Sequence, residues 1–174
     1  MLSKIRTVAL NGMQGMEIEI QTDLSPGLPY FEITGMGDTA VREAAGRVKR
    51  AIANSGFEYP RHKITVNLAP AYVKKSGSHF DLGIAVGLLK ASGALKGKTD
   101  DTIFIGELSF DGKVLPARGV LPMITAVSAV LGIAGAKEIV IPEANCPEAY
   151  LFTADTGMEI IPAVSLMQIG QHIG

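Results

Sequence analysis

The residue types that could do chemistry gather in one short stretch of this chain, Ser78-His79-Phe80-Asp81. Serine, histidine and aspartate form the triads of acyl-transfer enzymes, but neighbours in sequence rarely converge as a triad. Asp81 is better explained as a helix-start residue, because the helix dipole favours a carboxylate there. The three histidines and the single cysteine, Cys146, have no metal-ligand spacing. Cys146 precedes Pro147, and a helix start there would lower the pKa of its thiol. A single cysteine in a small domain is more often simply packed in the interior, and we favour that interpretation.

Two glycine-rich stretches resemble nucleotide-binding motifs. The stretch 35–40 reads G-x-G-x-x-A between an expected strand and an expected helix. However, it follows the third strand of the chain, and Asp38 would place negative charge at the helix N-terminus, where pyrophosphate binds. The stretch 93–99 is one residue short of a P-loop, and it runs from a helix to a strand, the reverse of P-loop order. We interpret both stretches as turns and predict no nucleotide-hydrolysis machinery in this chain.

Five basic residues near the loop at 69–80 are candidate contacts for DNA or a partner: Arg61, Lys63, Lys74, Lys75 and Arg118. If they gather on one edge, they could contact phosphates without sequence preference. The alternative is a solvated rim, since no series of aromatic residues accompanies them for base stacking. The net charge of -1 provides no global field that would attract nucleic acid.

Two loops would have to position these residues. The first joins an expected strand at 63–68 to an expected helix at 80–92, which is apolar on nearly every side and is therefore expected at the centre. Gly83 and Gly87 lie one turn apart on this helix and would let another backbone approach closely. The second loop, within 106–122, contains an Asp111-Gly112 hairpin turn.

Hydrophobic periodicity and turn residues predict the other elements. Strands are expected at 4–10, 16–23, 30–34, 102–108, 113–115, 137–141 and 158–161. Helices are expected at 39–55, with Asp38 as N-cap, and at 120–131, 147–153 and 165–173. We therefore expect a single α+β domain over residues 1–174, with helices packed on a mixed sheet.

Composition narrows the class of protein further. The chain is 47% hydrophobic and 19% charged, as is usual for a globular domain. A single cysteine excludes an internal disulfide and fits a reducing compartment. No apolar leader opens the sequence, and no window approaches the roughly 20 apolar residues of a membrane span. We therefore expect a cytoplasmic protein that does not contact the membrane.

With these stretches in view, the chain resembles the N-terminal domain of the ComM/YifB family, the magnesium-chelatase-like AAA+ ATPases of bacteria. The resemblance covers essentially all 174 residues. It rests on ordered blocks of sequence: Gly27-Leu28-Pro29, Asp38-Thr39-Ala40-Val41, Asn54-Ser55-Gly56-Phe57, Ile64-Thr65-Val66-Asn67-Leu68-Ala69-Pro70, Phe80-Asp81-Leu82, Gly106-Glu107-Leu108-Ser109 and Arg118-Gly119-Val120-Leu121-Pro122.

This resemblance implies the ribosomal protein S5 domain 2-like fold of the Lon proteolytic domain. It also implies ATP-driven work on DNA, notably branch migration in the recombination of DNA taken up during natural transformation. In the family a hexameric ring performs this work, and its AAA+ motor, which binds ATP and Mg, would follow Gly174. We expect no cofactor within the present chain.

The resemblance to Lon supplies a test at the level of residues. Lon-type peptidases use a serine nucleophile that a lysine deprotonates. The serine block of the family aligns with 75–81 and puts the nucleophile position at His79. The lysine block aligns with 114–121 and puts the base position at Leu121. Because leucine cannot accept a proton, and Ser78 would need a new base, the resemblance implies a catalytically inactive Lon-like domain.

Two hypotheses follow for the function of the chain. In the first, it is the accessory domain of a DNA-remodelling AAA+ ATPase, shapes the ring, and guides DNA along the Lys74-Lys75 loop. In the second, it is a protein-interaction or oligomerisation module without direct DNA contact, as the near-neutral charge favours. Magnesium chelation, which the family name suggests, has no metal-ligand or porphyrin-binding constellation to support it.

Overall fold

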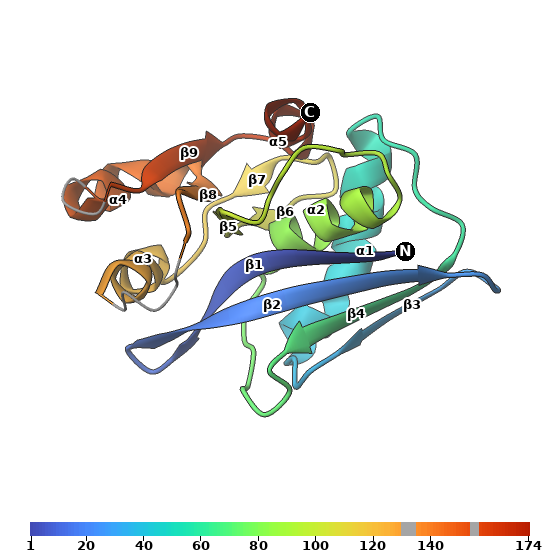
Figure 1. The fold of residues 1–174 in the computed structure, drawn as a ribbon, viewed down its shortest axis with the longest axis horizontal. Helices are drawn as coiled ribbons and strands as arrows, with labels where there is room; N and C mark the ends of the chain where they lie inside the picture. The colour runs from blue at the N-terminus through green and yellow to red at the C-terminus, as the bar shows by residue number, and fades with distance from the viewer. Residues whose placement is uncertain (130–134, 154–156) are drawn as a thin grey trace.

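A seven-stranded sheet forms the frame of the molecule (Figure 1). The computed structural model describes residues 1–129, 135–153 and 157–174. The strands of this sheet are β1 (Leu2–Asn11), β2 (Gln14–Ser25), β3 (Tyr30–Thr34), β4 (Lys63–Ala69), β5 (Thr102–Phe104), β8 (Glu138–Pro142) and β9 (Glu159–Ala163). Their order is β3-β4-β2-β1-β5-β8-β9. The β1–β2 and β2–β4 pairs are antiparallel, and the β3–β4, β1–β5, β5–β8 and β8–β9 pairs are parallel. The sheet is therefore mixed and mostly parallel, and the predicted α+β class is confirmed.

Helices pack on both faces of this sheet. The larger core lies on the face covered by α1 (Thr39–Asn54), α2 (Asp81–Ala91) and α5 (Leu166–Ile173). A smaller core lies on the other face, under α3 (Val120–Ala129) and α4 (Cys146–Thr153), which follows the short 3-10 helix η1 (Glu143–Asn145). The two cores are possible because successive side chains of a strand alternate between faces. Ile103 and Ile139 face the smaller core, whereas Phe104 and Val140 face the larger one.

The central position predicted for the apolar helix is confirmed. Every residue of α2 except Lys90 is buried. A Cβ atom added at Gly83 would lie 2.6 Å from Cδ1 of Ile20, and one added at Gly87 would lie 2.8 Å from Oγ1 of Thr22. In addition, the hydroxyl of Ser3 donates to the carbonyl of Gly87 at 2.6 Å. The two glycines therefore allow α2 to lie directly on β1 and β2, as predicted.

The strand expected at 102–108 is wrong in one respect, because it is divided between two sheets. After β5, the N–H of Ile105 still donates to the carbonyl of Val140 at 2.9 Å. At Gly106 the backbone turns to α2, where its N–H donates to the carbonyl of His79 at 2.9 Å and its carbonyl accepts from the N–H of Leu82 at 3.0 Å. The chain then forms β6 (Glu107–Leu108), which pairs with β7 (Val114–Leu115) in a separate antiparallel ladder.

The other expected elements occur within a few residues of their predicted bounds. The helix expected at 120–131 is described to Ala129, and its last two positions lie outside the described residues. No helix in the described ranges combines the length and apolarity needed to cross a membrane.

Candidate functional site

The loop between β4 and α2 is held against the turn that precedes α1. The N–H of Lys75 donates to the carbonyl of Met36 at 3.1 Å, and the N–H of Asp38 donates to the carbonyl of Lys75 at 2.9 Å. Gly35 makes this turn possible, because its φ is +102° and a Cβ there would lie 2.3 Å from the carbonyl oxygen of Leu68. The loop is therefore positioned by backbone contacts with a segment nearly 40 residues earlier in the chain.

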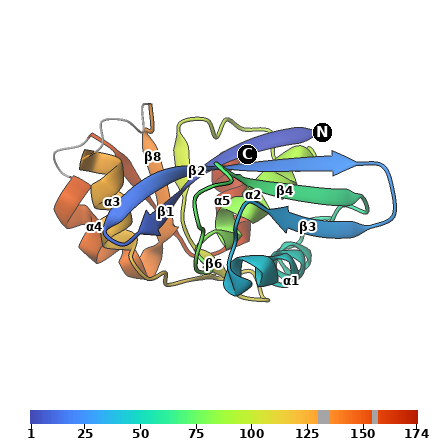
Figure 2. The ribbon, with the colours of Figure 1, turned by 90° about the horizontal axis from the view of Figure 1, so that it is seen from below.

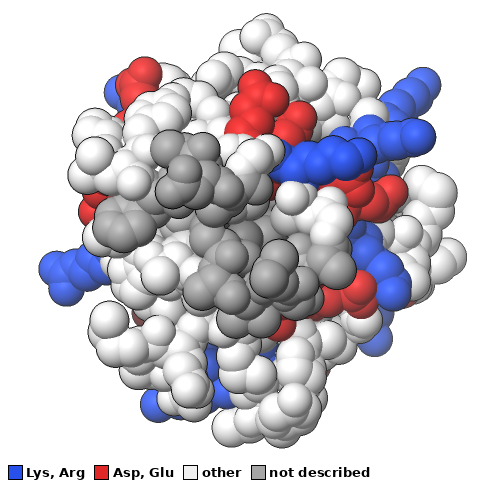
Figure 3. Space-filling view, turned by 60° about the vertical axis from the view of Figure 1, so that its left-hand side comes forward, with Lys and Arg blue, Asp and Glu red and all other residues white. Residues whose placement is uncertain are grey.

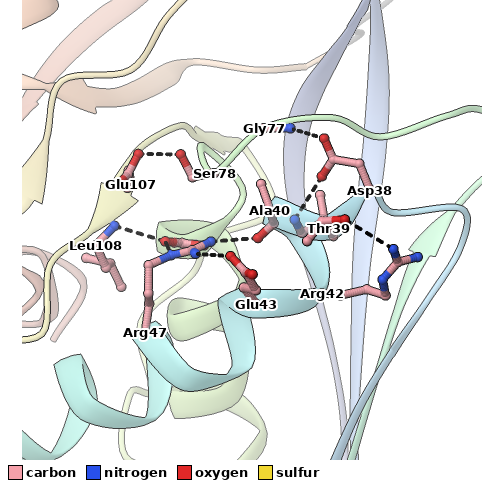
Figure 4. A network of polar contacts seen from close by, with 12 residues as sticks. Asp38, Thr39, Ala40, Arg42, Glu43, Arg47, Gly77, Ser78, Glu107 and Leu108 are labelled. Atoms are coloured by element: carbon pink, nitrogen blue, oxygen red, sulfur yellow. Dashed lines mark hydrogen bonds and ion pairs between the residues drawn. The ribbon is translucent and has the colours of Figure 1, made fainter.

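Asp38 joins α1 to this loop through its carboxylate (Figure 4). One oxygen accepts the N–H of Val41 at 2.9 Å and caps α1, as predicted. The other accepts the hydroxyl of Ser76 at 2.7 Å and the N–H of Gly77 at 3.1 Å. Burial raises the pKa of Asp38, but these hydrogen bonds outweigh burial and lower it overall. The resulting negative charge occupies the helix N-terminus where the glycine motif would have to receive a phosphate.

A buried ion pair lies at the start of α2. Nε of Arg47 is 2.6 Å from Oδ2 of Asp81, and its Nη2 is 3.0 Å from Oδ1. Oδ2 of Asp81 also accepts the N–H of Leu108 at 3.2 Å, which ties α2 to β6. Asp81 is fully buried, and burial raises its pKa to about 6 although Arg47 and the Leu108 N–H act in the opposite direction. Asp81 is the first residue of α2, as expected from sequence, and its ion pair with Arg47 also anchors α2 to α1.

Arg47 was not among the predicted site residues. Its neighbours Ala44, Val48 and Ala51 are all buried in the larger core. Its position three residues after Ala44 and four before Ala51 places it at the margin of the buried face of α1. This spacing, together with a carboxylate at the start of an otherwise apolar helix, is the sequence signal that could have found the pair.

Ser78 has a carboxylate partner that sequence reasoning also missed. Its hydroxyl donates to Oε2 of Glu107 (Figure 4). Glu107 is the first residue of β6, the strand that forms where the chain leaves the larger sheet. The pair places a serine hydroxyl beside a carboxylate, but it contains no imidazole or amine that could act as the base of a Lon-type dyad.

His79 and Leu121, which the resemblance to Lon puts at the two dyad positions, form no nucleophile–base pair. The ring of His79 is 6% exposed, and its Nε2 lies 2.8 Å from the carbonyl oxygen of Val8. Because a carbonyl can only accept, Nε2 carries the proton of this hydrogen bond. Burial lowers the pKa of His79 and keeps the ring neutral, although Val8 and the charge of Asp38 oppose this shift. Leu121 is half-buried in the first turn of α3.

The structure separates the five basic candidates. Lys75 is 0% exposed, its ammonium donates to the carbonyl of Pro70, and burial lowers its pKa. Its inclusion as a surface contact is therefore wrong, because the side chain points into the protein. Lys74 is exposed in the loop after β4, whereas Arg61 and Lys63 are exposed at the start of that strand. Seven residues of strand put about 20 Å between these two ends.

Arg118 is exposed in the turn before α3. Viewed from the end of the molecule that carries α3 and α4, the described lysines and arginines alternate with acidic residues and form no single patch (Figure 3). A hollow of about 630 Å³ includes Arg61 and lies at the C-terminal end of α2, opposite the polar network. No single edge therefore gathers all five candidates.

Cys146 is packed in the interior, as expected for a single cysteine, and the alternative of a lowered thiol pKa is wrong. It does stand at the first position of α4, as its position before Pro147 predicts. However, it is 4% exposed, and burial, with a further contribution from Glu143, raises its pKa. Within the described ranges, no three of His, Cys, Asp and Glu lie together as a candidate metal site.

The fold and the site together define an α+β domain in which a central buried helix is joined to a hydrogen-bonded polar loop. A family model described as subunit ChlI of Mg-chelatase matches residues 20–145. The chain is 39% identical to YifB of Escherichia coli (strain K12), over 98% of this chain and 33% of YifB. It is 37% identical to competence protein ComM of Haemophilus influenzae, over 86% of this chain and 29% of ComM. The chain belongs to this magnesium-chelatase-like family and matches the N-terminal domain of its ComM and YifB members.

A more distant similarity supports the comparison with Lon. The chain is 27% identical to an archaeal Lon protease of Pyrococcus abyssi over 175 aligned residues, which are 97% of this chain and 17% of that protease. The chain spans about a third of the length of the YifB and ComM proteins that it matches.

Proposed function

We propose that this chain is a Lon-like accessory domain, without peptidase activity, of a ComM-type AAA+ ATPase. The complete protein would assemble as a cytoplasmic hexamer, bind ATP and Mg in a separate motor domain, and drive branch migration of DNA during recombination. Residues 1–174 would serve as one domain with the S5 domain 2-like fold. The similarity to ComM and the family match support this assignment.

The observation that carries the proposal is the placement of His79. At the position that aligns with the Lon nucleophile, the chain has a neutral imidazole whose Nε2–H is committed to the carbonyl of Val8. Leu121, at the position of the base, offers no proton acceptor. The neighbouring hydroxyl of Ser78 donates to the carboxylate of Glu107, so its described partner is not the lysine amine that a Lon-type dyad uses.

Peptidase activity is tested on the chain and on a Ser78→Ala variant with an unstructured protein substrate and a serine-directed fluorophosphonate. We expect no turnover and no labelling of either protein. The proposal would be overturned if the parent cleaved the substrate or reacted with the fluorophosphonate and Ser78→Ala did not. That result would identify Ser78 as a working nucleophile. Archaeal Lon serves as the positive control for the substrate and the label.

Contact with DNA is proposed for the exposed side chain of Lys74, with Arg118 as a second candidate. In the full-length protein, Lys74→Glu should weaken binding to a four-way junction and reduce the salt dependence of that binding, because one phosphate contact is lost. Lys96→Glu makes the same charge change at an exposed loop position beyond the other end of α2 and is the matched control. Equal binding by both variants and the parent would refute a DNA role for this loop.

The alternative function is a protein-interaction module that touches no DNA. This alternative is favoured because the basic candidates are separated from one another and Lys75 is buried. They therefore do not form a continuous phosphate-binding surface. The junction-binding experiment also decides between the two functions. If the domain does not contact DNA, Lys74→Glu leaves the affinity of the full-length protein for DNA unchanged.

A further inference from the structure

A groove lies between α1 and the starts of β3 and β4, and β3 is an edge strand of the sheet. β3 pairs with β4 on one side, and no strand in the described residues pairs with it on the other. In Figure 2 it lies at the margin of the sheet, next to α1. Every second N–H and C=O of such a strand points away from its neighbour, and these unpaired groups can bind another extended chain. Many edge strands are protected by a bulge or a proline, whereas β3 contains no proline and its register with β4 runs without a break from Tyr30 to Thr34.

The groove has apolar walls and an open floor. It measures about 250 Å³, and its lining includes Phe31 of β3, Ala45 and Gly46 of α1, and Tyr59. A Cβ atom added at Gly46 would have no heavy atom within 4 Å, so this part of α1 leaves space beside the strand. The side chain of Phe31 is half-buried, which leaves part of its apolar surface accessible. The groove is therefore suited to one aliphatic side chain.

The lysine that lines the groove is positive, and the exposed acidic residues of the two neighbouring elements, Glu32 of β3 and Glu43 of α1, are not part of its lining. Lys49 lines it, with its ammonium 5.6 Å from the centre of the Tyr59 ring. Arg42 lies seven residues earlier on α1, two turns along the same side of the helix, and its side chain is exposed. Among the described residues that line the groove, none is acidic. An occupant with carboxylates on either side of its apolar residue would complement this arrangement.

We propose that the β3 edge and this groove bind an extended acidic segment of a partner protein, which adds to the sheet as a further strand. Its recognition pattern is acidic–x–apolar–x–acidic, because residues two apart lie on the same face of a strand. The apolar residue enters the groove beside Gly46, and the two carboxylates face Arg42 and Lys49. Main-chain hydrogen bonds to the edge provide affinity, as in other cases of strand addition. This site is independent of Lys74 and of the dyad positions.

The test uses the blocked peptide acetyl-Thr-Glu-Thr-Val-Thr-Glu-Thr-amide with a fluorophore, and binding to the chain is measured by fluorescence anisotropy. We expect saturable binding of this peptide and none of the same peptide with lysine in place of both glutamates. Lys49→Glu should weaken binding at least about tenfold, because an attraction becomes a repulsion. Arg50→Glu is the matched control, since this side chain lies over Phe110, away from the groove, and should leave affinity unchanged.

Two further measurements separate strand addition from surface attraction. Gly46→Leu fills the groove without altering charge, and because Gly46 is in a helix with open space around it, the variant should fold and lose the peptide. N-methylation of one alternate set of peptide amides should abolish binding, and methylation of the other set should not. The proposal would be overturned if the peptide did not bind, or if Arg50→Glu weakened binding as much as Lys49→Glu. It would also be overturned if both sets of methylated amides had equal effects on binding. Self-association of the chain that Gly46→Leu abolishes would overturn it too, because a second copy would then be the occupant.

Discussion

Removing the charge of Asp81 should change how the stability of the domain depends on pH. Burial raises the pKa of Asp81 in the folded protein to about 6, from 3.8 for an exposed aspartate. Between these two values the folded state holds a proton that the unfolded state releases. The contribution of Asp81 to the free energy of unfolding is therefore largest below about pH 4 and is lost as the pH rises through 6.

The size of the effect follows from the difference in pKa. A difference of about two pKa units corresponds to about 3 kcal/mol of free energy of unfolding. Most of this contribution, about 2–3 kcal/mol, is lost between pH 4 and pH 7. Urea unfolding of the parent and of Asp81→Asn is compared across this range, because asparagine keeps the shape of the side chain but does not titrate. We expect the stability of the parent relative to the variant to fall by that amount as the pH rises.

Asp111→Asn provides a control with a different pH window. Asp111 is exposed, and hydrogen bonds from the Ser109 hydroxyl and then from the Lys113 N–H lower its pKa to about 2. Its contribution to stability is present above pH 4 and is lost only as the pH falls toward 2. The difference in free energy of unfolding between the parent and Asp111→Asn should therefore stay constant from pH 4 to pH 7. The reasoning would be refuted if the Asp81→Asn difference rose with pH, since the ion pair with Arg47 would then outweigh burial.

Three further predictions concern packing and reactivity. Arg47→Met leaves Asp81 buried without its cation and should destabilise the domain by about 3–5 kcal/mol at pH 7. The loss should be smaller at pH 5, because the carboxyl group of Asp81 can take up a proton there. Urea unfolding at both pH values measures the loss, and an equal loss at both would contradict the prediction. Gly87→Ala should lower the free energy of unfolding by about 1–3 kcal/mol, because the added methyl group meets a buried hydroxyl of β2. Gly46→Ala, in open space on a helix, should raise it by about 0.5–1 kcal/mol. Thermal unfolding of both variants measures these changes. The thiol of Cys146 should react with a disulfide reagent at pH 8 only at the rate of unfolding, and rapid labelling of the folded protein would show that burial does not protect it.

The parts of the structure that sequence predicted well depend on neighbours in the chain. Asp38 caps the helix that follows it, and its signal lies within three residues. Gly83 and Gly87 marked the side of α2 on which β1 and β2 lie, because glycine destabilises a helix interior unless a neighbouring element needs the space. The division of the strand at Gly106 was missed because its cause lies more than 20 residues away in sequence. The carbonyl of His79 and the N–H of Leu82, at the start of α2, form hydrogen bonds with Gly106.

The candidate site was predicted less well for the same reason. The pair of Arg47 and Asp81 joins residues 34 apart, and no local pattern specifies it. Lys75 was expected at the surface because lysine usually is, but a backbone carbonyl at Pro70 allows its ammonium to be buried. The assignment of His79 to the nucleophile position stays a prediction from the resemblance to Lon. The partner of its ring, the carbonyl of Val8, could be found only from the fold.

The loop between β4 and α2 contacts three parts of the chain that are distant from one another in sequence. Asp38 holds it from the start of α1, Glu107 from β6, and Val8 from β1. Such a loop can reach its native form only after all three elements are in place, so it should be among the last segments to become ordered during folding. Once ordered, it cannot open alone, and the amide hydrogens of Lys75 and Gly77 should exchange with solvent only through cooperative unfolding of a large part of the domain.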